Sequence, residues 1–225
     1  MADKNVKNNA QKNEDALSKS EAFFLKNKKV IIGGVIAIVA IIALWVIIDM
    51  LVITPNRVKG QEALAKGQTY FANDDMAKAL LGDSTDFKGF AKLADEFSGK
   101  NANLANLYSG LAYAQQGNWE EAVKYLEKYK DQGDQMVSPA AEGALGNAYA
   151  HLKKLDEAVK HLKNAAKRAD NNSLSPTFLI QAGEILESQG KKAEALELYK
   201  EVKEKYFQSM QYQTIDAYIE RASAK

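Results

Sequence analysis

The chain of 225 residues contains no cysteine and only two histidines and three prolines. Without cysteine it forms no disulfide bonds, which fits a periplasmic protein and a cytosolic one equally well. The histidines, His151 and His161, are single and far from any catalytic signature, since no HExxH, GxSxG or phosphate-loop motif occurs. We therefore expect no enzyme, no cofactor, no metal site and no small-molecule substrate.

The chain also lacks an excess of charge of either sign. Its 30 basic and 29 acidic residues give a formal net charge of +1. Nucleic-acid binding needs a basic face that neutralises phosphates, so this balance argues against a nucleic-acid partner. After residue 53 the charges alternate along the expected helices, as they do on a solvated surface.

One long hydrophobic run is present. Residues 30–48 carry no charge, and the apolar character continues past Asp49 to residue 53. Its valines, isoleucines and leucines together favour membrane insertion by roughly 4 to 8 kcal/mol. Asp49 costs less than the ~3 kcal/mol expected at the centre of a membrane, because it lies near the end of the run. The run has no small-residue cleavage site after it, so we expect an uncleaved anchor in the lipid bilayer over residues 30–53.

Charges flanking this run predict its orientation. More lysines precede it than follow it, which favours a cytoplasmic amino terminus and an external, periplasmic array in a bacterial inner membrane. The first 19 residues are polar and predict a tail without fixed structure. The expected divisions are therefore a cytoplasmic tail and interfacial start (1–25), a transmembrane signal anchor (26–53) and a periplasmic domain (54–225).

Small residues form a stripe on the expected membrane helix. Gly33, Ala37 and Ala40 fall on one side at helical spacing, and Asp49 lies on nearly the opposite side. Such a stripe lets a second helix approach closely, so we expect it to be a contact site within the membrane. The alternative is that alanine is simply common in membrane helices.

A sequence repeat occupies the second half of the chain. "GNWEEAV" at 117–123, "KKLDEAV" at 153–159 and "GKKAEAL" at 190–196 share their small and acidic positions. Upstream, Gly110, Gly146 and Gly183 lie at one fixed distance before Ala122, Ala158 and Ala195. A period in the mid-thirties predicts an array of helix pairs.

The glycines, alanines and prolines of the repeat each have a physical role at their positions. Glycine on the first helix and alanine on the second allow two helix axes to cross closely. Pro139 and Pro176 stand where first helices begin, and a missing N–H costs nothing there. Glycines in "QQGN" and "SQGK" predict left-handed turns between paired helices. Lys153 and Lys154 take that place in the middle repeat and put such a turn in doubt.

This pattern resembles the tetratricopeptide repeat family over residues 103–205, with a degraded repeat over 58–100 that contains Gly67, Tyr70, Ala79 and the inserted "GDSTD". The resemblance implies an all-α fold: one transmembrane helix, then an α-solenoid of helix pairs with a C-terminal capping helix. It also implies a concave groove, lined by the first helices, that binds protein partners. The expected groove residues are Leu104, Leu107, Leu111, Gln115, Asn147, His151, Ile180, Glu184 and Ser188.

Two readings of this groove remain open. Some proteins of the family clamp a peptide's terminal carboxylate with lysine and asparagine. Only Asn147 fits that clamp here, because Leu107, Gly143 and Ile180 stand at its basic positions. The leucines could instead pack on the preceding degraded repeat. His151 is expected near the groove and His161 on the outer face, both as surface residues.

The order of anchor and repeats is also similar to the ancillary subunit of the bacterial Sec translocon (YfgM-like proteins). "FFLKNKKVII", "GFAKLADEF" and "NLANLYSGLAYAQQGNWEEAVKYL" carry this likeness. It implies a scaffold or chaperone whose partners are Sec translocon subunits and a membrane-bound periplasmic chaperone. A scaffold for another envelope-assembly or cell-division complex has the same architecture.

Overall fold

A computed structural model describes residues 2–83 and 85–224, with side chains from residue 21 onward. The chain divides into two compact units, Met1–Asn56 and Arg57–Lys225, which are taken separately below. Over the described ranges the secondary structure is helical throughout, without a strand. The expected all-α class is therefore confirmed.

The first unit is dominated by one long helix. α1 spans Ala2–Ile48 and passes into a π-helical turn, η1, over Asp49–Ile53. Composition predicted a tail without fixed structure over the first 19 residues, whereas the structure continues the helix back to Ala2. A helix satisfies its own backbone hydrogen bonds and so needs no core to form its ladder. At η1 the Thr54 hydroxyl donates to Asp49 Oδ2 over 3.3 Å.

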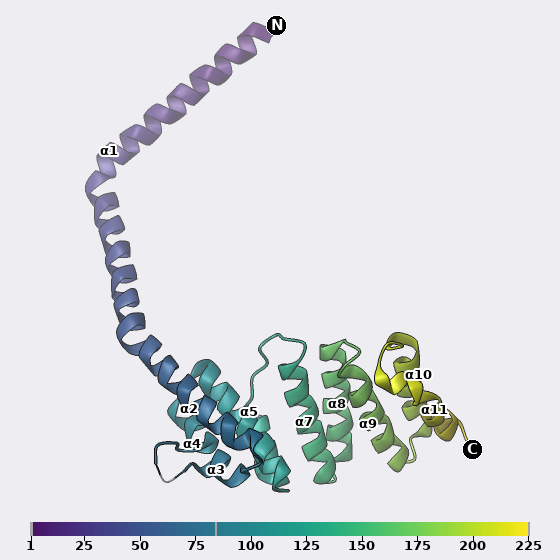
Figure 1. Ribbon diagram of the computed structural model, residues 1–225. Helices are drawn as coiled ribbons and strands as arrows, with labels where there is room; N and C mark the ends of the chain where they lie inside the picture. Colours follow the sequence, from purple (N-terminus) through teal and green to yellow (C-terminus); the bar gives the residue numbers. More distant parts are fainter. Residues whose placement is uncertain (1, 84, 225) are drawn as a thin grey trace. The chain divides into compact units, whose positions relative to one another are not determined.

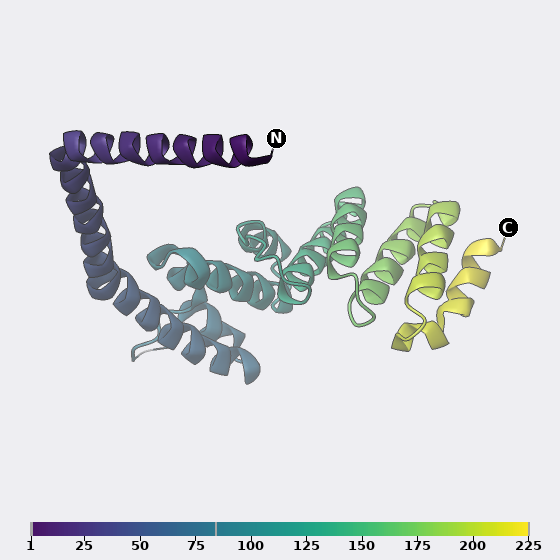
Figure 2. The ribbon, with the colours of Figure 1, turned by 90° about the horizontal axis from the view of Figure 1, so that it is seen from above.

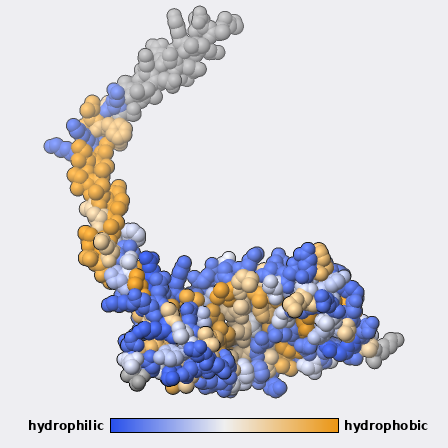
Figure 3. Space-filling view, viewed as in Figure 1, coloured by the Kyte–Doolittle hydropathy of each residue, from blue (hydrophilic) through white to orange (hydrophobic). Residues whose placement is uncertain are grey.

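The hydrophobic run of α1 is long and apolar enough to span a membrane. Its best window within Glu21–Ala72 has a mean hydropathy of 3.1, and none of that window is buried inside the protein. Figure 3 shows the run as a continuous orange surface with blue side chains beside its amino-terminal end. Exposed isoleucine and valine on this scale are typical of a segment that apolar surroundings cover.

The second unit is an array of antiparallel helices. Figures 1 and 2 show α7 to α11 standing side by side in chain order. The helices are α2 (Thr54–Ala72), α3 (Met76–Leu81), α4 (Phe90–Glu96), α5 (Gly99–Gln115), α6 (Trp119–Leu126), α7 (Val137–His151), α8 (Leu155–Ala169), α9 (Ser175–Ser188), α10 (Lys192–Lys205), the 3₁₀ turn η2 (Met210–Gln213) and α11 (Ile215–Ser223). The pairs α5/α6, α7/α8 and α9/α10 are the three predicted repeats.

Glycine allows a close backbone crossing in two of the three pairs, as the sequence predicted for all three. A Cβ on Gly146 would lie 2.9 Å from Leu162 Cγ and 3.2 Å from the Ala158 carbonyl oxygen. Gly110 makes the same approach to the carbonyl oxygen of Ala122, also at 3.2 Å. In the third pair a Cβ on Gly183 would instead meet the Tyr199 ring at 2.4 Å. The glycine thus allows close backbone approach in two pairs, and in the third it leaves room for an aromatic ring.

The turn between paired helices has one geometry in all three repeats. Gly117 and Gly190 both have φ of +75°, and Lys153 has φ of +60°. The doubt raised by the missing glycine of the middle repeat is thus resolved, because a lysine adopts the left-handed conformation there. Neighbouring helices fix this conformation, which costs an L-residue about 1–2 kcal/mol.

The degraded first repeat has its second helix broken into α3 and α4. Gly67 of α2 leaves room for Phe87 and Phe90, since a Cβ would meet either ring within 2.6 Å. Asp83 organises the inserted loop: its Oδ1 accepts the N–H groups of Asp86 and Phe87 at 3.0 and 3.1 Å, and its Oδ2 accepts the Tyr70 hydroxyl at 2.7 Å. These bonds, with that of Tyr70 the largest, hold the pKa of Asp83 far below its usual value.

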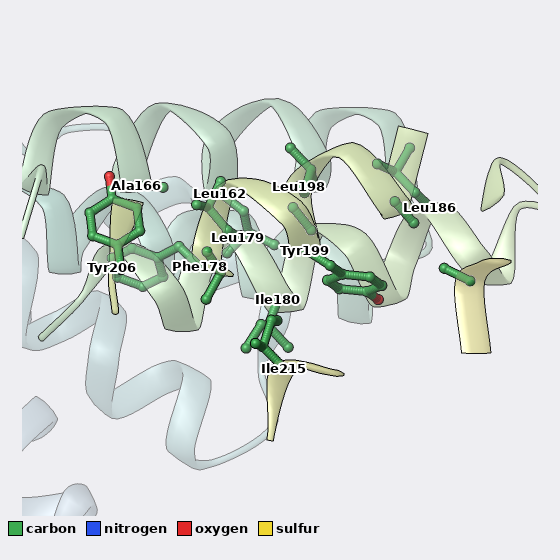
Figure 4. Packing of buried hydrophobic residues seen from close by; sticks show 14 of the residues in the cluster. Leu162, Ala166, Phe178, Leu179, Ile180, Leu186, Leu198, Tyr199, Tyr206 and Ile215 are labelled. Atoms are coloured by element: carbon green, nitrogen blue, oxygen red, sulfur yellow. The ribbon is translucent and has the colours of Figure 1, made fainter. Parts of the chain in front are cut away.

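The C-terminal helix closes the array. α11 buries Ile215 (0% exposed) and Ala222 (5%) against the last pair. Figure 4 shows Ile215 in the same cluster as Ile180, Tyr199 and Leu198. Repeat arrays need such an end, because the last pair would otherwise expose its apolar face. The expected capping helix is confirmed.

Candidate protein-binding surface

The repeat frame sorts the predicted groove residues into rows. Residues at equivalent places in α5, α7 and α9 are 36 and 37 positions apart, as the glycines are. The first row is Leu107, Gly143 and Ile180, the second is Leu111, Asn147 and Glu184, and the third is Gln115, His151 and Ser188. Leu104 lies one turn before the first row.

The first row lies in the core. Leu107 is 6% exposed and Ile180 is 8% exposed, and a Cβ on Gly143 would meet the Phe178 ring at 2.2 Å. Leu104 is half-buried against the cluster of Phe87 and Phe90. The alternative that the leucines pack on the preceding degraded repeat describes Leu104, whereas Leu107 packs in the cluster with Ala122 and Leu145. Ile180 is buried in the cluster of the last pair. These three do not form an open surface.

The second row changes along the array from apolar to polar. Leu111 is half-buried in the cluster shared by α5, α6 and α7, Asn147 is half-buried, and Glu184 is exposed. Neither Asn147 nor Glu184 makes a side-chain hydrogen bond within the described residues. Their polar groups are therefore available to an outside partner.

The third row is exposed and closes each first helix. Gln115, His151 and Ser188 are the last residues of α5, α7 and α9. The Gln115 amide donates to Asp74 Oδ1 over 2.5 Å, and the Ser188 hydroxyl donates to the Ile185 carbonyl oxygen over 2.6 Å. Of the nine predicted residues, the exposed ones are therefore Gln115, His151, Glu184 and Ser188.

His151 has an aromatic neighbour that the sequence did not indicate. Its ring stacks on Trp119, with centroids 3.7 Å apart and planes 1° from parallel. Trp119 is the first residue of α6, and His151 is the last residue of α7. Their contact depends on how α6 packs against α7, so no spacing in the sequence indicates it. Stacked, partly exposed aromatic rings of this kind supply rigid contact area to a protein partner.

Charged groups beside the third row are already paired. Glu187 accepts from Arg221 Nε at 3.1 Å and from the Tyr199 hydroxyl at 2.8 Å, so α9, α10 and α11 are joined. Arg221 first and Tyr199 second lower the pKa of Glu187, against the effect of burial. Burial and the Glu187 carboxylate raise the pKa of Tyr199 well above its usual value. The ion pair between Glu187 and Arg221 fixes the end of the array.

His161 is fixed in a similar way on α8. Its Nδ1 lies 3.0 Å from Glu142 Oε1, and its ring stacks on Tyr149 at 5.2 Å. The Tyr149 hydroxyl donates to Glu127 Oε1 over 2.5 Å, and this bond, with burial second, raises the pKa of Tyr149 to about 12. These contacts tie α6, α7 and α8 together and present no nucleophile. Within the described residues no cluster of His, Asp or Glu has the arrangement of a metal site.

The small-residue stripe of α1 is open. Gly33, Ala37 and Ala40 are exposed, and a Cβ on Gly33 would meet nothing within 4 Å. Close approach of a second helix to this stripe stays a prediction.

The array belongs to the class of tetratricopeptide-like repeat folds. A solved structure of a kinesin light chain from Podosopora anserina with nearly identical TPR-like repeats matches it with a TM-score of 0.56 at 16% sequence identity, covering 75% of this chain and 85% of that chain. Residues 56–217 match the family described as "T7SS, ESX-1 secretion system protein EccA1, N-terminal domain", and the chain belongs to this family. No curated protein matches the chain.

Proposed function

We propose that this protein is a membrane-anchored scaffold that binds protein partners through the exposed ends of its first helices. The observation that carries the proposal is the third row: Gln115, His151 and Ser188 repeat at equivalent, solvent-exposed positions of three helix pairs. A partner laid along the array would meet one exposed polar side chain at the same place in each repeat. Arrays of this type act by such extended contacts.

The partners proposed first are Sec translocon subunits and a membrane-bound periplasmic chaperone. The likeness of the anchor-plus-repeat order to the ancillary translocon subunit supports this assignment. The family's name, which describes a domain of a secretion-system protein, supports a place in protein export. The second candidate is a scaffold for another envelope-assembly or cell-division complex, which has the same architecture.

The proposed location is the inner membrane, with residues 30–53 in the bilayer and the array in the periplasm. A helix of sufficient length and hydropathy supports the membrane anchor. The lysine excess before it supports a cytoplasmic amino terminus. The stripe of Gly33, Ala37 and Ala40 is a second proposed contact, made to a partner's helix within the membrane.

Affinity purification of the full chain from detergent-solubilised membranes tests the choice of partner. Under the first proposal, translocon subunits co-purify in fixed proportion to the scaffold. Recovery of a different envelope complex without translocon subunits supports the second candidate and overturns the first.

A matched pair of variants tests the surface. The triple variant Gln115→Ala, His151→Ala and Ser188→Ala removes the exposed third-row side chains from the ends of the first helices. The control triple, Glu157→Ala, Lys160→Ala and Glu197→Ala, removes exposed groups from the second helices α8 and α10. We expect partner recovery to fall only in the first triple, while both variants keep the same helical circular dichroism. Equal recovery from both would remove the first-helix ends from the binding surface.

A further inference from the structure

A pocket lies at the amino end of α5, apart from every predicted groove residue. It has a volume of about 360 Å³ and is lined by the first two turns of α5 and by the segment that follows α6. Asn103 joins these two walls: its Nδ2 donates to the Lys130 carbonyl oxygen over 2.7 Å, and its Oδ1 accepts the Lys130 N–H at 2.6 Å. The pocket is therefore held in shape by a paired amide.

Asn106, one of the residues that line this pocket, has an unpartnered acceptor. Asn106 is 8% exposed, and its Nδ2 donates to the Ala102 carbonyl oxygen over 2.9 Å. This bond fixes which end of the amide is the acceptor, and that acceptor, Oδ1, is buried without a hydrogen-bond partner. Leaving a buried acceptor unpaired costs about 1–3 kcal/mol, which a ligand donor would offset if the amide turned toward it on binding.

The same pocket is electropositive. Lys100, Lys128 and Lys130 line it, and none of them makes an ion pair with a described residue. The two acidic residues beside these lysines in the sequence have other partners: Asp131 pairs with Arg168, and Glu127 accepts the Tyr149 hydroxyl. The amino end of α5 adds its own partial positive charge, because the first backbone N–H groups of a helix have no partner within it.

The next two repeats show which groups lie at the start of their first helices. One repeat later, Asp134 Oδ1 accepts the N–H groups of Met136 and Ser138 at 2.9 and 3.2 Å and so caps the start of α7. A further repeat on, Asn171 Oδ1 accepts the N–H groups of Ser173 and Leu174, both at 2.9 Å, before α9.

At α5 the place equivalent to Asp134 is held by Ser98, which makes no capping hydrogen bond. The place equivalent to Ser138 is held by Ala102, whose methyl group can make none. Neither residue caps α5, which begins at Gly99, two residues earlier in the repeat frame than α7 begins at Val137.

We infer that this pocket binds an acidic segment of a partner polypeptide. A ligand must bring negative charge for the three ammonium groups and the helix terminus, and a hydrogen-bond donor for Asn106 Oδ1. An aspartate or glutamate within a peptide supplies both, since its carboxylate meets the lysine ammonium groups and a backbone N–H reaches Asn106. Binding requires no terminal carboxylate of the peptide. The pocket is separate from the surface formed by Gln115, His151 and Ser188.

Fluorescence anisotropy with the full chain in detergent tests this inference. The probe is a short labelled peptide, blocked at both ends, with aspartates between glycines; its control has asparagine in place of aspartate. We expect the acidic peptide to bind and the asparagine peptide to bind at least about tenfold more weakly, as expected for loss of hydrogen bonds to a charged group. Equal binding of the two peptides would overturn the inference.

Two variants with the same change of charge locate the site. Lys128→Ala with Lys130→Ala removes two pocket lysines. The control, Lys154→Ala with Lys160→Ala, removes two exposed lysines elsewhere; Lys154 lies over the Tyr149 ring at 5.5 Å, as Lys128 lies over the Tyr125 ring at 5.1 Å. Binding should weaken about tenfold in the first variant and stay unchanged in the second. An equal loss of binding in both variants would mean that the protein attracts the acidic peptide by its overall charge and has no specific site for it.

The role of Asn106 is tested without altering the protein. Methylating the peptide's backbone nitrogens at the aspartates removes the N–H donors and keeps every charge. We expect this peptide to bind about fivefold more weakly, the value of one neutral hydrogen bond. Unchanged binding of the methylated peptide, or full displacement of the acidic peptide by equimolar inorganic phosphate, would mean a simple anion site and overturn the assignment to a polypeptide.

Discussion

At the scale of the residue, Lys153 is the position where local preference and tertiary structure disagree. Its φ of +60° matches the glycines that occupy the same turn in the other two repeats. The strain of about 1–2 kcal/mol for an L-residue exceeds the entropy that a glycine adds to the unfolded chain, about 0.5–1 kcal/mol.

We therefore predict that Lys153→Gly stabilises the protein by up to about 1 kcal/mol, measured as a rise in the urea midpoint of Arg57–Lys225. The neighbouring substitution Lys154→Gly serves as the control, because Lys154 has φ of −86° and gains no relief. A lower midpoint for Lys153→Gly would mean that the lysine side chain holds the turn by a contact of its own.

Asp134 makes the stability of the fold depend on pH in the acidic range. The Ser138 hydroxyl first, and then the backbone N–H groups of Met136, Ser138 and Val137, lower its pKa from 3.8 to about 2. A carboxyl whose pKa is lower in the folded state stabilises above its unfolded pKa, and this contribution is lost as pH falls through the folded value.

Between about pH 4 and pH 2 the wild-type protein should thus lose stability faster than Asp134→Asn, while at pH 7 the variant should be the less stable by about 1 kcal/mol, as for loss of a helix cap. Urea midpoints across this range measure both effects. Asp95→Asn, at an exposed carboxyl, is the control. Parallel curves for wild type and Asp134→Asn would contradict the assignment.

At the scale of the element, the crossing of α7 and α8 depends on Ala158. Its side chain is 0% exposed, and its carbonyl oxygen lies against Gly146. Ala158→Leu forces the two helices apart, and overpacking of this kind costs roughly 1–3 kcal/mol. We predict a lower melting temperature for Arg57–Lys225, followed by circular dichroism.

The control for this substitution is Lys160→Leu, an exposed position on the same helix, which should melt as the wild type does. If Ala158→Leu melts at an unchanged temperature, the helices can separate without loss and the close crossing is not a requirement of the fold.

At the scale of the whole molecule, the proposed topology sets which residues a protease can reach. With residues 30–53 in the inner membrane and the amino terminus in the cytoplasm, protease added to spheroplasts should remove the array and leave an amino-terminal tag intact. Immunoblots against tags at both ends measure this. Protection of the carboxyl-terminal tag together with digestion after lysis would reverse the proposed orientation.

The sequence by itself determined the repeat, the apolar helix and two of the three close crossings. Each depends on short-range spacing: a period in the mid-thirties, an uncharged run over residues 30–48, and glycine opposite alanine. Gly110, Gly146 and Ala158 lie where this spacing placed them. Such features follow from the chain because only small residues fit between packed helices and only apolar residues enter a membrane.

Tertiary structure alone decided which side chains are exposed and which groups meet. Leu107 and Ile180 share a helix face with His151 and Ser188 in the repeat pattern, yet neighbouring repeats bury the first two and leave the others at the surface. The contact of Trp119 with His151 and the unpaired oxygen of Asn106 likewise depend on how one repeat stacks on the next. Stacking is set by contacts between distant parts of the chain, and local periodicity carries no information about them.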